Sequence, residues 1–149
     1  LIVRRAGETR RVLVASPAYL ARRGEPHSVA ELANHAVIQF LPLAPTHEWT
    51  FAQDSRVTIA PHYVTNSADA ALWHAEQGGG LTLALSYQVV DAVRDGRLRL
   101  VLAGHEPAIL PIQWVYPTSR LLSAKVRAFW AVAREEITGA AIPPPYLWR

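Results

Sequence analysis

Cysteine is absent from this chain, so neither a disulfide framework nor a thiolate metal site is available to it. No apolar run is long enough to cross a bilayer, and Arg4 and Arg5 follow Leu1-Ile2-Val3 at once, unlike a signal peptide. Lysine is nearly absent as well, because only Lys125 among the 15 basic residues is a lysine. The arginines are scattered in pairs, so the formal net charge of +3 does not predict a nucleic-acid-binding face. We therefore expect a cytoplasmic protein.

The composition is that of a folded domain. Of the 149 residues, 50% are hydrophobic and 18% are charged, which excludes disorder by composition. A chain of this length is expected to form one domain with a substantial buried core. We find no internal repeat and no low-complexity segment.

Predicted strands alternate with predicted helices. Arg11 to Ala15 is short, apolar and β-branched, and Ser16-Pro17 then begins a helix that Gly24 ends. Ser28 is expected to cap a second short helix over 29–34, with Glu31 completing a capping box. The other predicted strands are 37–41, 48–51, 56–60, 62–65, 81–85, 98–102 and 112–116, and the other predicted helices are 68–77, 87–94 and 123–137. This alternation predicts an α/β fold with a mainly parallel sheet.

The best candidate site is Asn66-Ser67-Ala68, at the beginning of a predicted helix. A helix N-terminus offers unpaired N–H groups and a positive dipole end, which suit a carboxylate or a similar anion. The alternative is that Asn66 or Ser67 is only an N-cap, and the two roles are compatible. Phe40 and Leu41 end a predicted parallel strand, where ligands bind in open α/β sheets, so they are the apolar pocket candidates.

Other motifs do not predict chemistry. Gly78-Gly79-Gly80 follows a helix and has no Gly-Lys-Ser/Thr sequence, so it predicts a helix C-cap and a turn rather than a phosphate loop. The six histidines show no ligand spacing, so we expect no metal and no cofactor. Neither a Gly-x-Ser-x-Gly elbow nor a His-Glu-x-x-His helix is present, and no carboxylate has an obvious partner carboxylate. We therefore expect no catalytic residues and no enzymatic activity.

Four aromatic residues fit core positions, namely Trp49, Phe51, Trp114 and Phe129. The longest predicted helix carries an apolar stripe at helical spacing, made of Val126, Phe129, Trp130, Ala133 and Ile137. The tail after Gly139 contains three consecutive prolines and cannot extend that helix.

Three segments together resemble the effector-binding domain of LysR-type transcriptional regulators. They are Ser16 to Pro26, Asn66 to Leu72 and Ser123 to Phe129, and the resemblance covers roughly residues 10 to 137. It implies two α/β lobes joined by two crossing strands, as in type 2 periplasmic binding proteins. One lobe would be nearly complete here, with remnants of the other.

The resemblance also implies a division of the chain. Residues 1–16 would be the end of the first lobe and the first crossing strand, and 17–111 the second lobe. Residues 112–149 would be the return crossing strand, the C-terminal helix of the first lobe and the tail. Because the front of the first lobe is missing, we expect the apolar stripe to pack differently, to pair with another chain or to remain exposed.

The implied function is that of a sensor. A small effector, often a carboxylate or aromatic metabolite, would bind between the lobes and change how dimers pack in a tetramer. Asn66, Ser67 and Ala68 would hold the effector, Phe40 and Leu41 would pack on it, and Ser16 would lie at the hinge. DNA would be bound only through an N-terminal domain that this chain lacks, and no membrane would be involved. The competing hypothesis is a solute-binding protein of a transport system, which shares the architecture.

Overall fold

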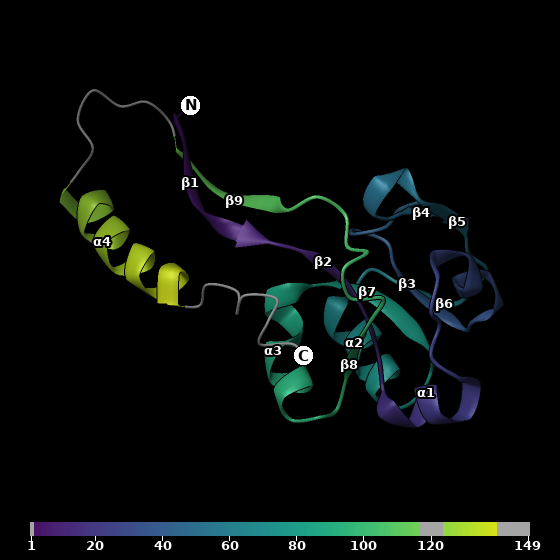
Figure 1. Ribbon diagram of the computed structural model, residues 1–149. Coiled ribbons are helices and arrows are strands. Elements are labelled where there is room, and N and C mark those ends of the chain that lie inside the picture. The colour runs from purple at the N-terminus through teal and green to yellow at the C-terminus, as the bar shows by residue number, and fades with distance from the viewer. Residues whose placement is uncertain (1, 117–123, 140–149) are drawn as a thin grey trace. The chain divides into compact units, whose positions relative to one another are not determined.

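The computed structural model describes residues 2–116 and 124–139, and the chain forms two compact units (Figure 1). Unit 1 consists of Leu1–Thr9 and Ile109–Arg149, and unit 2 of Arg10–Ala108. Unit 2 therefore begins and ends slightly earlier in the sequence than the lobe 17–111 that the resemblance implies. Ser123 and the tail after Gly139 lie outside the described residues.

Unit 1 contains a two-stranded antiparallel sheet and a helix. Strand β1 (Ile2–Thr9) pairs with β9 (Leu110–Tyr116), with an irregularity between Arg5 and Gly7, and α4 (Ala124–Gly139) belongs to the same unit. The sequence pattern does not predict β1, because its polar residues lack strict alternation and its partner lies more than a hundred residues away. The pairing across that separation is what makes this segment a strand.

The apolar stripe of α4 contacts β9 through two aromatic side chains. The ring of Trp114 on β9 contacts Phe129 edge-on at a centroid distance of 5.7 Å, and Trp130 at 5.8 Å. Nevertheless 59% of Phe129 and 36% of Val126 are exposed, so the prediction that Phe129 is a core residue is wrong. Two strands offer too narrow a surface to cover a whole helix face. Of the three outcomes expected for the stripe, the described residues therefore show an exposed apolar patch. The side chain of Ile137 lies outside the described residues.

Unit 2 is built on a five-stranded sheet in the order β6-β3-β7-β2-β8. Its strands are β2 (Arg11–Ala15), β3 (Val37–Phe40), β6 (Pro61–Thr65), β7 (Leu81–Leu85) and β8 (Arg99–Val101). Strand β3 is parallel to β6 and β7, whereas β2 is antiparallel to β7 and β8. Four strands of this sheet therefore run in the same direction, and β2 runs in the opposite direction. The sheet is mainly parallel in strand direction, as expected, except for β2.

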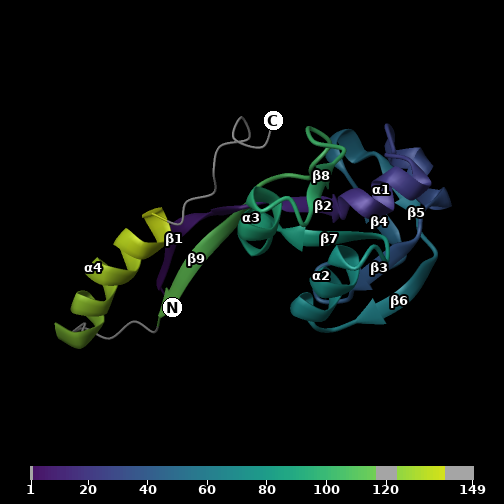
Figure 2. The ribbon, with the colours of Figure 1, turned by 90° about the horizontal axis from the view of Figure 1, so that it is seen from below.

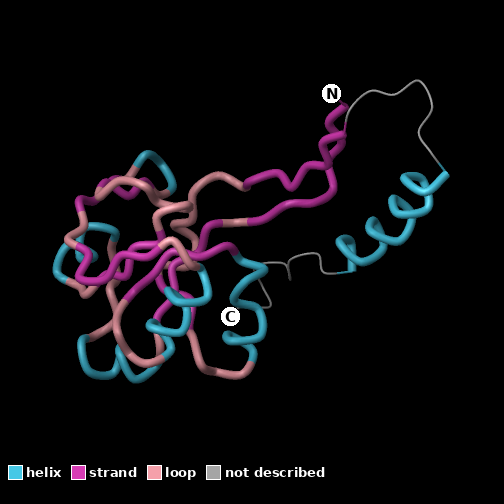
Figure 3. Tube along the Cα trace, turned by 180° about the vertical axis from the view of Figure 1, so that it is seen from behind, coloured by secondary structure: helices cyan, strands magenta, loops and turns pink. Residues whose placement is uncertain are grey.

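Short helices and a hairpin cover this sheet, as the views from below and from behind show (Figures 2 and 3). They are α1 (Pro17–Arg23), the 3-10 helix η1 (Val29–Asn34), the hairpin of β4 (Glu48–Thr50) and β5 (Arg56–Thr58), the 3-10 turn η2 (Ala52–Asp54), α2 (Ala68–Glu76) and α3 (Ser86–Arg94). The elements confirm the predicted α/β class.

Alternation along the central strand β2 divides the core into two layers. Leu13 and Ala15 face a cluster that includes side chains of α1, η1 and the hairpin, among them Trp49 and Phe51, which are buried as predicted. Val12 and Val14 face the other way, into a cluster with the buried residues of α2 and α3. Because both faces are covered, β2 is a continuous apolar run rather than an alternating one.

The two predicted caps near the start of unit 2 have different outcomes. Ser16 caps α1 as expected, since its Oγ accepts the N–H of Tyr19 at 3.2 Å. Ser28 forms no side-chain cap on η1; its hydroxyl instead donates to Glu31 at 2.9 Å. The N–H of His27 donates to the same carboxylate at 3.0 Å. Together these hydrogen bonds lower the pKa of Glu31 below its ordinary value of 4.5. The capping-box prediction was therefore wrong, because Glu31 engages the residues before the helix.

Candidate functional site

The carboxyl ends of the parallel strands form one edge of the sheet in unit 2, which we call the C-terminal edge. Phe40 is the register partner of Thr65, and the N–H of Leu41 donates to the carbonyl of Thr65 at 3.0 Å. The end of β3 therefore lies directly beside the turn Asn66-Ser67 that leads into α2. Ligands of open α/β sheets bind at this edge, outside the carboxyl ends of the strands. The structure thus brings together five of the six predicted site residues.

The N-terminus of α2 supplies hydrogen-bond donors at the C-terminal edge. Ser67 is the N-cap: its Oγ accepts the N–H of Ala70 at 3.2 Å, and its own N–H donates to Thr65 at 3.1 Å. The first helical N–H groups, those of Ala68 and Asp69, have no acceptor within the helix. The capping role is therefore present, and it leaves the hydroxyl hydrogen of Ser67 and two amides for another molecule.

Solvent reaches this turn. Asn66 and Ser67 are exposed and Ala68 is half-buried. The exposed fraction of Leu41 is 39%, whereas Phe40 is half-buried and packs against the α2–α3 cluster. Leu41 accordingly presents apolar surface beside the polar turn, and Phe40 forms part of the layer beneath it.

A second helix begins at the same edge. Strand β7 ends at Leu85 and α3 begins at Ser86, so two helix N-termini with positive dipole ends lie at this edge. Ser86 and Arg10 form two hydrogen bonds with each other. The N–H of Arg10 donates to Ser86 Oγ at 3.2 Å, and the N–H of Ser86 donates to the carbonyl of Arg10 at 2.8 Å. This pair of hydrogen bonds fixes the start of β2 against the start of α3.

Arginine adds positive charge here. Because β2 is reversed, its first residue Arg11 pairs with Leu85, and Arg10 precedes it at the same edge. The buried Nε of Arg11 has no hydrogen-bond partner among the described residues. The exposed carboxylate of Asp69 in the first turn of α2 offsets part of this positive potential. The two helix ends and the two arginines favour an anion at this edge.

Sequence reasoning missed Arg10, Arg11 and Ser86. The arginine pair looks like ordinary solvated charge at the end of an element, and Ser86 like a turn residue. Only the reversed direction of β2 places the two arginines at the C-terminal edge, whereas Ser86 lies there because it follows the end of β7. The doublet Leu85-Ser86 at a strand-to-helix junction, similar to Asn66-Ser67, is the one sequence signal that could have indicated Ser86.

Ser16 does not lie with the other predicted site residues. It is 2% exposed and follows the last residue of β2, at the opposite edge of the sheet. Its Oγ lies close to the turn after α2, since a Cβ on Gly78 would be 3.8 Å from it. In the structure Ser16 therefore begins α1 in the interior of unit 2.

Unit 2 also has a cavity of about 410 Å³ away from the predicted site residues. It is lined by Ser28, Val29, Ala30, Ala52, Gln53, Ser55, Gly104 and His105. Within residues 2–116 and 124–139, no group of three or more histidine, cysteine or acidic side chains could hold a metal ion. No helix in the same part of the chain is long and apolar enough to span a membrane.

Solved structures define the class of this fold. The regulatory domain of CrgA, a LysR-type transcriptional regulator from Neisseria meningitidis, matches with a TM-score of 0.79 at 27% identity, over 91% of this chain and 68% of that one. The full-length structure of AphB, the Vibrio cholerae virulence activator of the LTTR family, matches with a TM-score of 0.79 at 26% identity, over 91% of this chain and 48% of that one. The type 2 periplasmic-binding-protein-like fold is thereby confirmed.

The sequence identifies the family. The profile of the LysR substrate binding domain matches residues 1–138, so the chain belongs to that family and is an effector-binding regulatory domain. The HTH-type transcriptional regulator YhjC of Escherichia coli is 32% identical to this chain over 134 residues. Another HTH-type transcriptional regulator of the same organism, YcaN, is 30% identical over 118 residues. These matches cover 87% and 78% of this chain but only 45% and 39% of the relatives. They support a regulator rather than a transport solute-binding protein.

Proposed function

We propose that this domain senses a small anionic molecule at the C-terminal edge of unit 2, as the effector-binding part of a LysR-type regulator. The observation that carries the proposal is the exposed turn Asn66-Ser67 at the N-terminus of α2, directly beside Leu41. The amides of Ala68 and Asp69 and the side chains of Asn66 and Ser67 would donate to a carboxylate. Leu41 would pack on an apolar or aromatic part of the same ligand.

The arrangement can discriminate between ligands by charge and shape. A carboxylate gains the α2 dipole and several N–H donors at once, whereas a cation is repelled by the same groups. A ligand that carries an apolar group next to its carboxylate would bind more tightly, because it would bury the exposed surface of Leu41. An aromatic or short aliphatic carboxylic acid therefore fits this edge better than a sugar or an amine.

The response would follow from differential affinity. A ligand shifts a conformational equilibrium only if it binds one arrangement more tightly than another. We propose that effector binding selects one arrangement of the regulator and thereby changes its promoter contacts, with DNA bound by segments other than this chain. This proposal is supported by the curated relatives, which are HTH-type regulators longer than the matched region. The chain itself is proposed not to be an enzyme.

Self-association is part of the proposal. Exposed large apolar side chains on α4, Phe129 at 59% and Val132 at 63%, form surface that a second copy could cover. We expect a homo-oligomer in the regulator, and sedimentation of wild type against Phe129→Glu tests this. A mass that corresponds to the monomer in both chains at high concentration would contradict it.

The effector site is tested by nuclear magnetic resonance of the uniformly ¹⁵N-labelled chain, titrated with acetate, benzoate and succinate. We expect the largest amide shifts at residues 66–69 and at Leu41, and the strongest response to the carboxylate with an apolar group. Ser67→Ala should weaken that binding by about tenfold, which corresponds to one charge-assisted hydrogen bond. Ser16→Ala is the matched control and should leave the affinity unchanged. Shifts confined to the cavity near Gln53 and His105, or no shifts at these probes, would overturn the assignment.

A further inference from the structure

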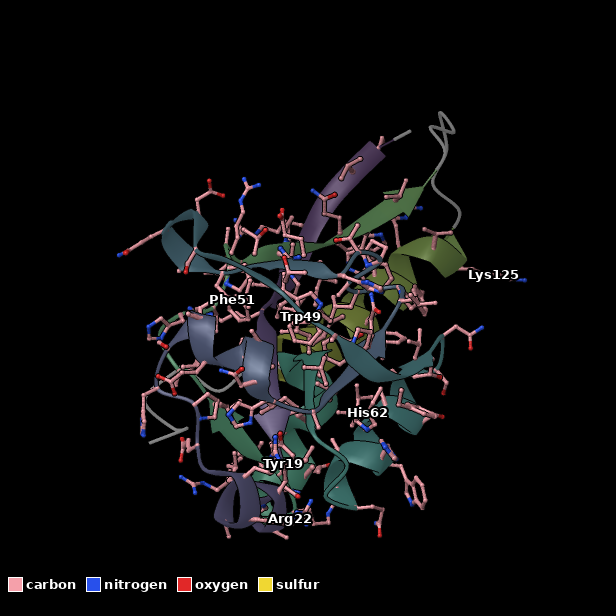
Figure 4. The ribbon with its side chains drawn as sticks, turned by 90° about the vertical axis from the view of Figure 1, so that its right-hand side faces the viewer. Tyr19, Arg22, Trp49, Phe51, His62 and Lys125 are labelled. Carbon is pink, nitrogen blue, oxygen red and sulfur yellow. The ribbon has the colours of Figure 1, made fainter. Side chains whose placement is uncertain are left out.

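Two histidines that are distant in the sequence meet on the outer side of unit 2. His62 is on the edge strand β6 and His74 is on α2, and their Nε2 atoms are 3.4 Å apart. Figure 2 shows α2 running beside β6, and Figure 4 labels His62 there. The ring centroids are 5.6 Å apart. The two imidazoles therefore bring their Nε2 atoms close together.

This spacing suits a shared metal ion better than a hydrogen bond. A hydrogen bond between nitrogen and a strong acceptor has a most common length of about 2.9–3.0 Å, so 3.4 Å is long for one. Two imidazole nitrogens bound to one tetrahedral Zn²⁺ at about 2.0–2.1 Å lie about 3.3–3.4 Å from each other. The observed separation of 3.4 Å matches the nitrogen–nitrogen distance of the second geometry.

The fold holds the His74 ring in place from two sides. Tyr63, next to His62 on β6, stacks on the His74 ring at a centroid distance of 4.7 Å. On another side lies Gly79, where a Cβ would come within 2.5 Å of the His74 Nε2 atom. A side chain at position 79 would therefore displace the ring. Glycine here leaves the space that the imidazole occupies, in addition to its part in the turn after α2.

The pair remains accessible to ions from solvent. His62 is exposed and His74 is half-buried, and β6 is an edge strand with no neighbour on its outer side in the described sheet. No third histidine or carboxylate completes the cluster among the described residues. Water would fill the other coordination positions, so the site would be open and its ion exchangeable. Imidazole ligands suit zinc, copper and nickel, and the Irving–Williams order favours Cu²⁺ among these.

We propose that His62 and His74 form a two-histidine chelate for a divalent transition-metal ion, Cu²⁺ or Zn²⁺, that joins strand β6 to helix α2. This site is separate from the proposed effector-binding turn and does not depend on it. Its ligands come from different elements, so it exists only in the folded chain. Metal binding should therefore raise the thermal stability of the wild-type protein.

Isothermal titration of the tag-free, full chain with CuCl₂ and ZnCl₂ tests the proposal. The pH should be neutral to slightly alkaline, because metal binding requires deprotonated imidazole. We expect one equivalent to bind, more tightly for Cu²⁺ than for Zn²⁺. His62→Ala or His74→Ala should each weaken it by about 10-fold or more, since loss of even an outer-shell partner costs about 10–100-fold. The double variant should lose little beyond either single variant, because a chelate with one ligand missing is already broken.

His47→Ala is the matched control, since His47 is exposed and lies in the loop before β4. It should bind metal like the wild type, and its melting temperature should rise with Zn²⁺ in the same way. His62 is exposed, so His62→Ala should melt like the wild type without metal. His74 is half-buried and stacks on Tyr63, so the melting temperature of His74→Ala with metal is compared with that of the same variant without metal. Wild-type binding that survives in the double variant would overturn the proposal. So would the absence of a one-equivalent Cu²⁺ isotherm in the wild type, or an equal loss in His47→Ala.

Discussion

Ser16 and Ser67 make the same local bond at opposite edges of one sheet. Each is an N-cap whose Oγ accepts the N–H of the residue three positions later, at 3.2 Å in both cases. Ser16 is 2% exposed, whereas Ser67 is exposed to solvent. The comparison shows that a cap alone does not indicate a binding site, since the same hydrogen bond occurs at both edges. We call the edge at Ser16, where the cap is buried, the closed edge, and the edge at Ser67, where the cap is exposed, the open edge.

What surrounds the two serines differs. Near Ser16 the side chain of Arg22 donates to the carbonyl of Gly78 at 2.8 Å, and Gly80 lies against the carbonyl of Ala36. Figure 4 shows Arg22 and Tyr19 together on α1. Near Ser67 the neighbours are the exposed side chains of Asn66 and Leu41. A small molecule can therefore reach Ser67 but not the buried Ser16.

The largest effect is expected at the closed edge, from Gly80→Ala. Gly80 has a φ of +146°, and an added Cβ would overlap the carbonyl oxygen of Ala36, which already accepts the N–H of Leu81 at 2.9 Å. Backbone strain and overpacking together should cost about 3 kcal/mol or more of the free energy of unfolding, measured by urea denaturation.

Gly96→Ala is the control for this substitution, since Gly96 has a φ of +74° but nothing within 4 Å of an added Cβ. It should cost only the left-handed backbone penalty of about 1–2 kcal/mol. Equal losses in the two variants would show that the close approach at Gly80 does not matter.

A smaller difference is expected between the two caps themselves. Ser16→Ala should lower the free energy of unfolding by about 1–2 kcal/mol, because the cap is buried, and Ser67→Ala by about 0.5–1 kcal/mol, because water replaces the lost bond. Both values come from urea denaturation of the full chain. A larger loss at Ser67 than at Ser16 would contradict the comparison of closed and open edges.

The smallest expected effect is a pH dependence at the closed edge. Burial lowers the pKa of His35 below its ordinary value of 6.5, and the positive charge of Arg23 lowers it further. The hydroxyl of Tyr19 accepts the N–H of Ala36 at 2.9 Å and lies 2.9 Å from His35 Nδ1, to which it can donate when the imidazole is neutral with its hydrogen on Nε2. Protonation of His35 would remove that acceptor.

The folded chain therefore binds this proton less readily than the unfolded chain, and stability should rise with pH. The contribution of His35 is complete above the ordinary pKa of 6.5 and is lost as the pH falls toward the lower folded pKa. Urea denaturation at several pH values between about 5 and 8 measures it. His35→Gln should flatten the slope and His47→Gln should not; an unchanged slope in the first variant would refute this role.

Local chemistry in the sequence was sufficient for most elements of unit 2. The apolar β-branched run at 11–15 predicts β2, and the serine and proline at 16–17 with the glycine at 24 predict the bounds of α1, all from residues a few positions apart. The turn Asn66-Ser67 likewise identified the beginning of α2 and the polar part of the candidate site. The predicted capping box at Ser28 was wrong because the Glu31 carboxylate had two possible sets of partners, and only the folded backbone selects between them.

The sequence by itself thus determined most strands and helices of unit 2, the caps of α1 and α2 and the buried run of β2, because each depends on residues a few positions apart. Only the tertiary structure decided which residues meet across long separations. The reversed direction of β2 takes Arg10 to Ser86, and the return of α2 along β6 takes His74 to His62. The exposure of Phe129 has the same origin, since burial depends on the partner surface rather than on the helix that carries the stripe. Periodicity identifies an apolar face, but packing alone determines whether that face is covered.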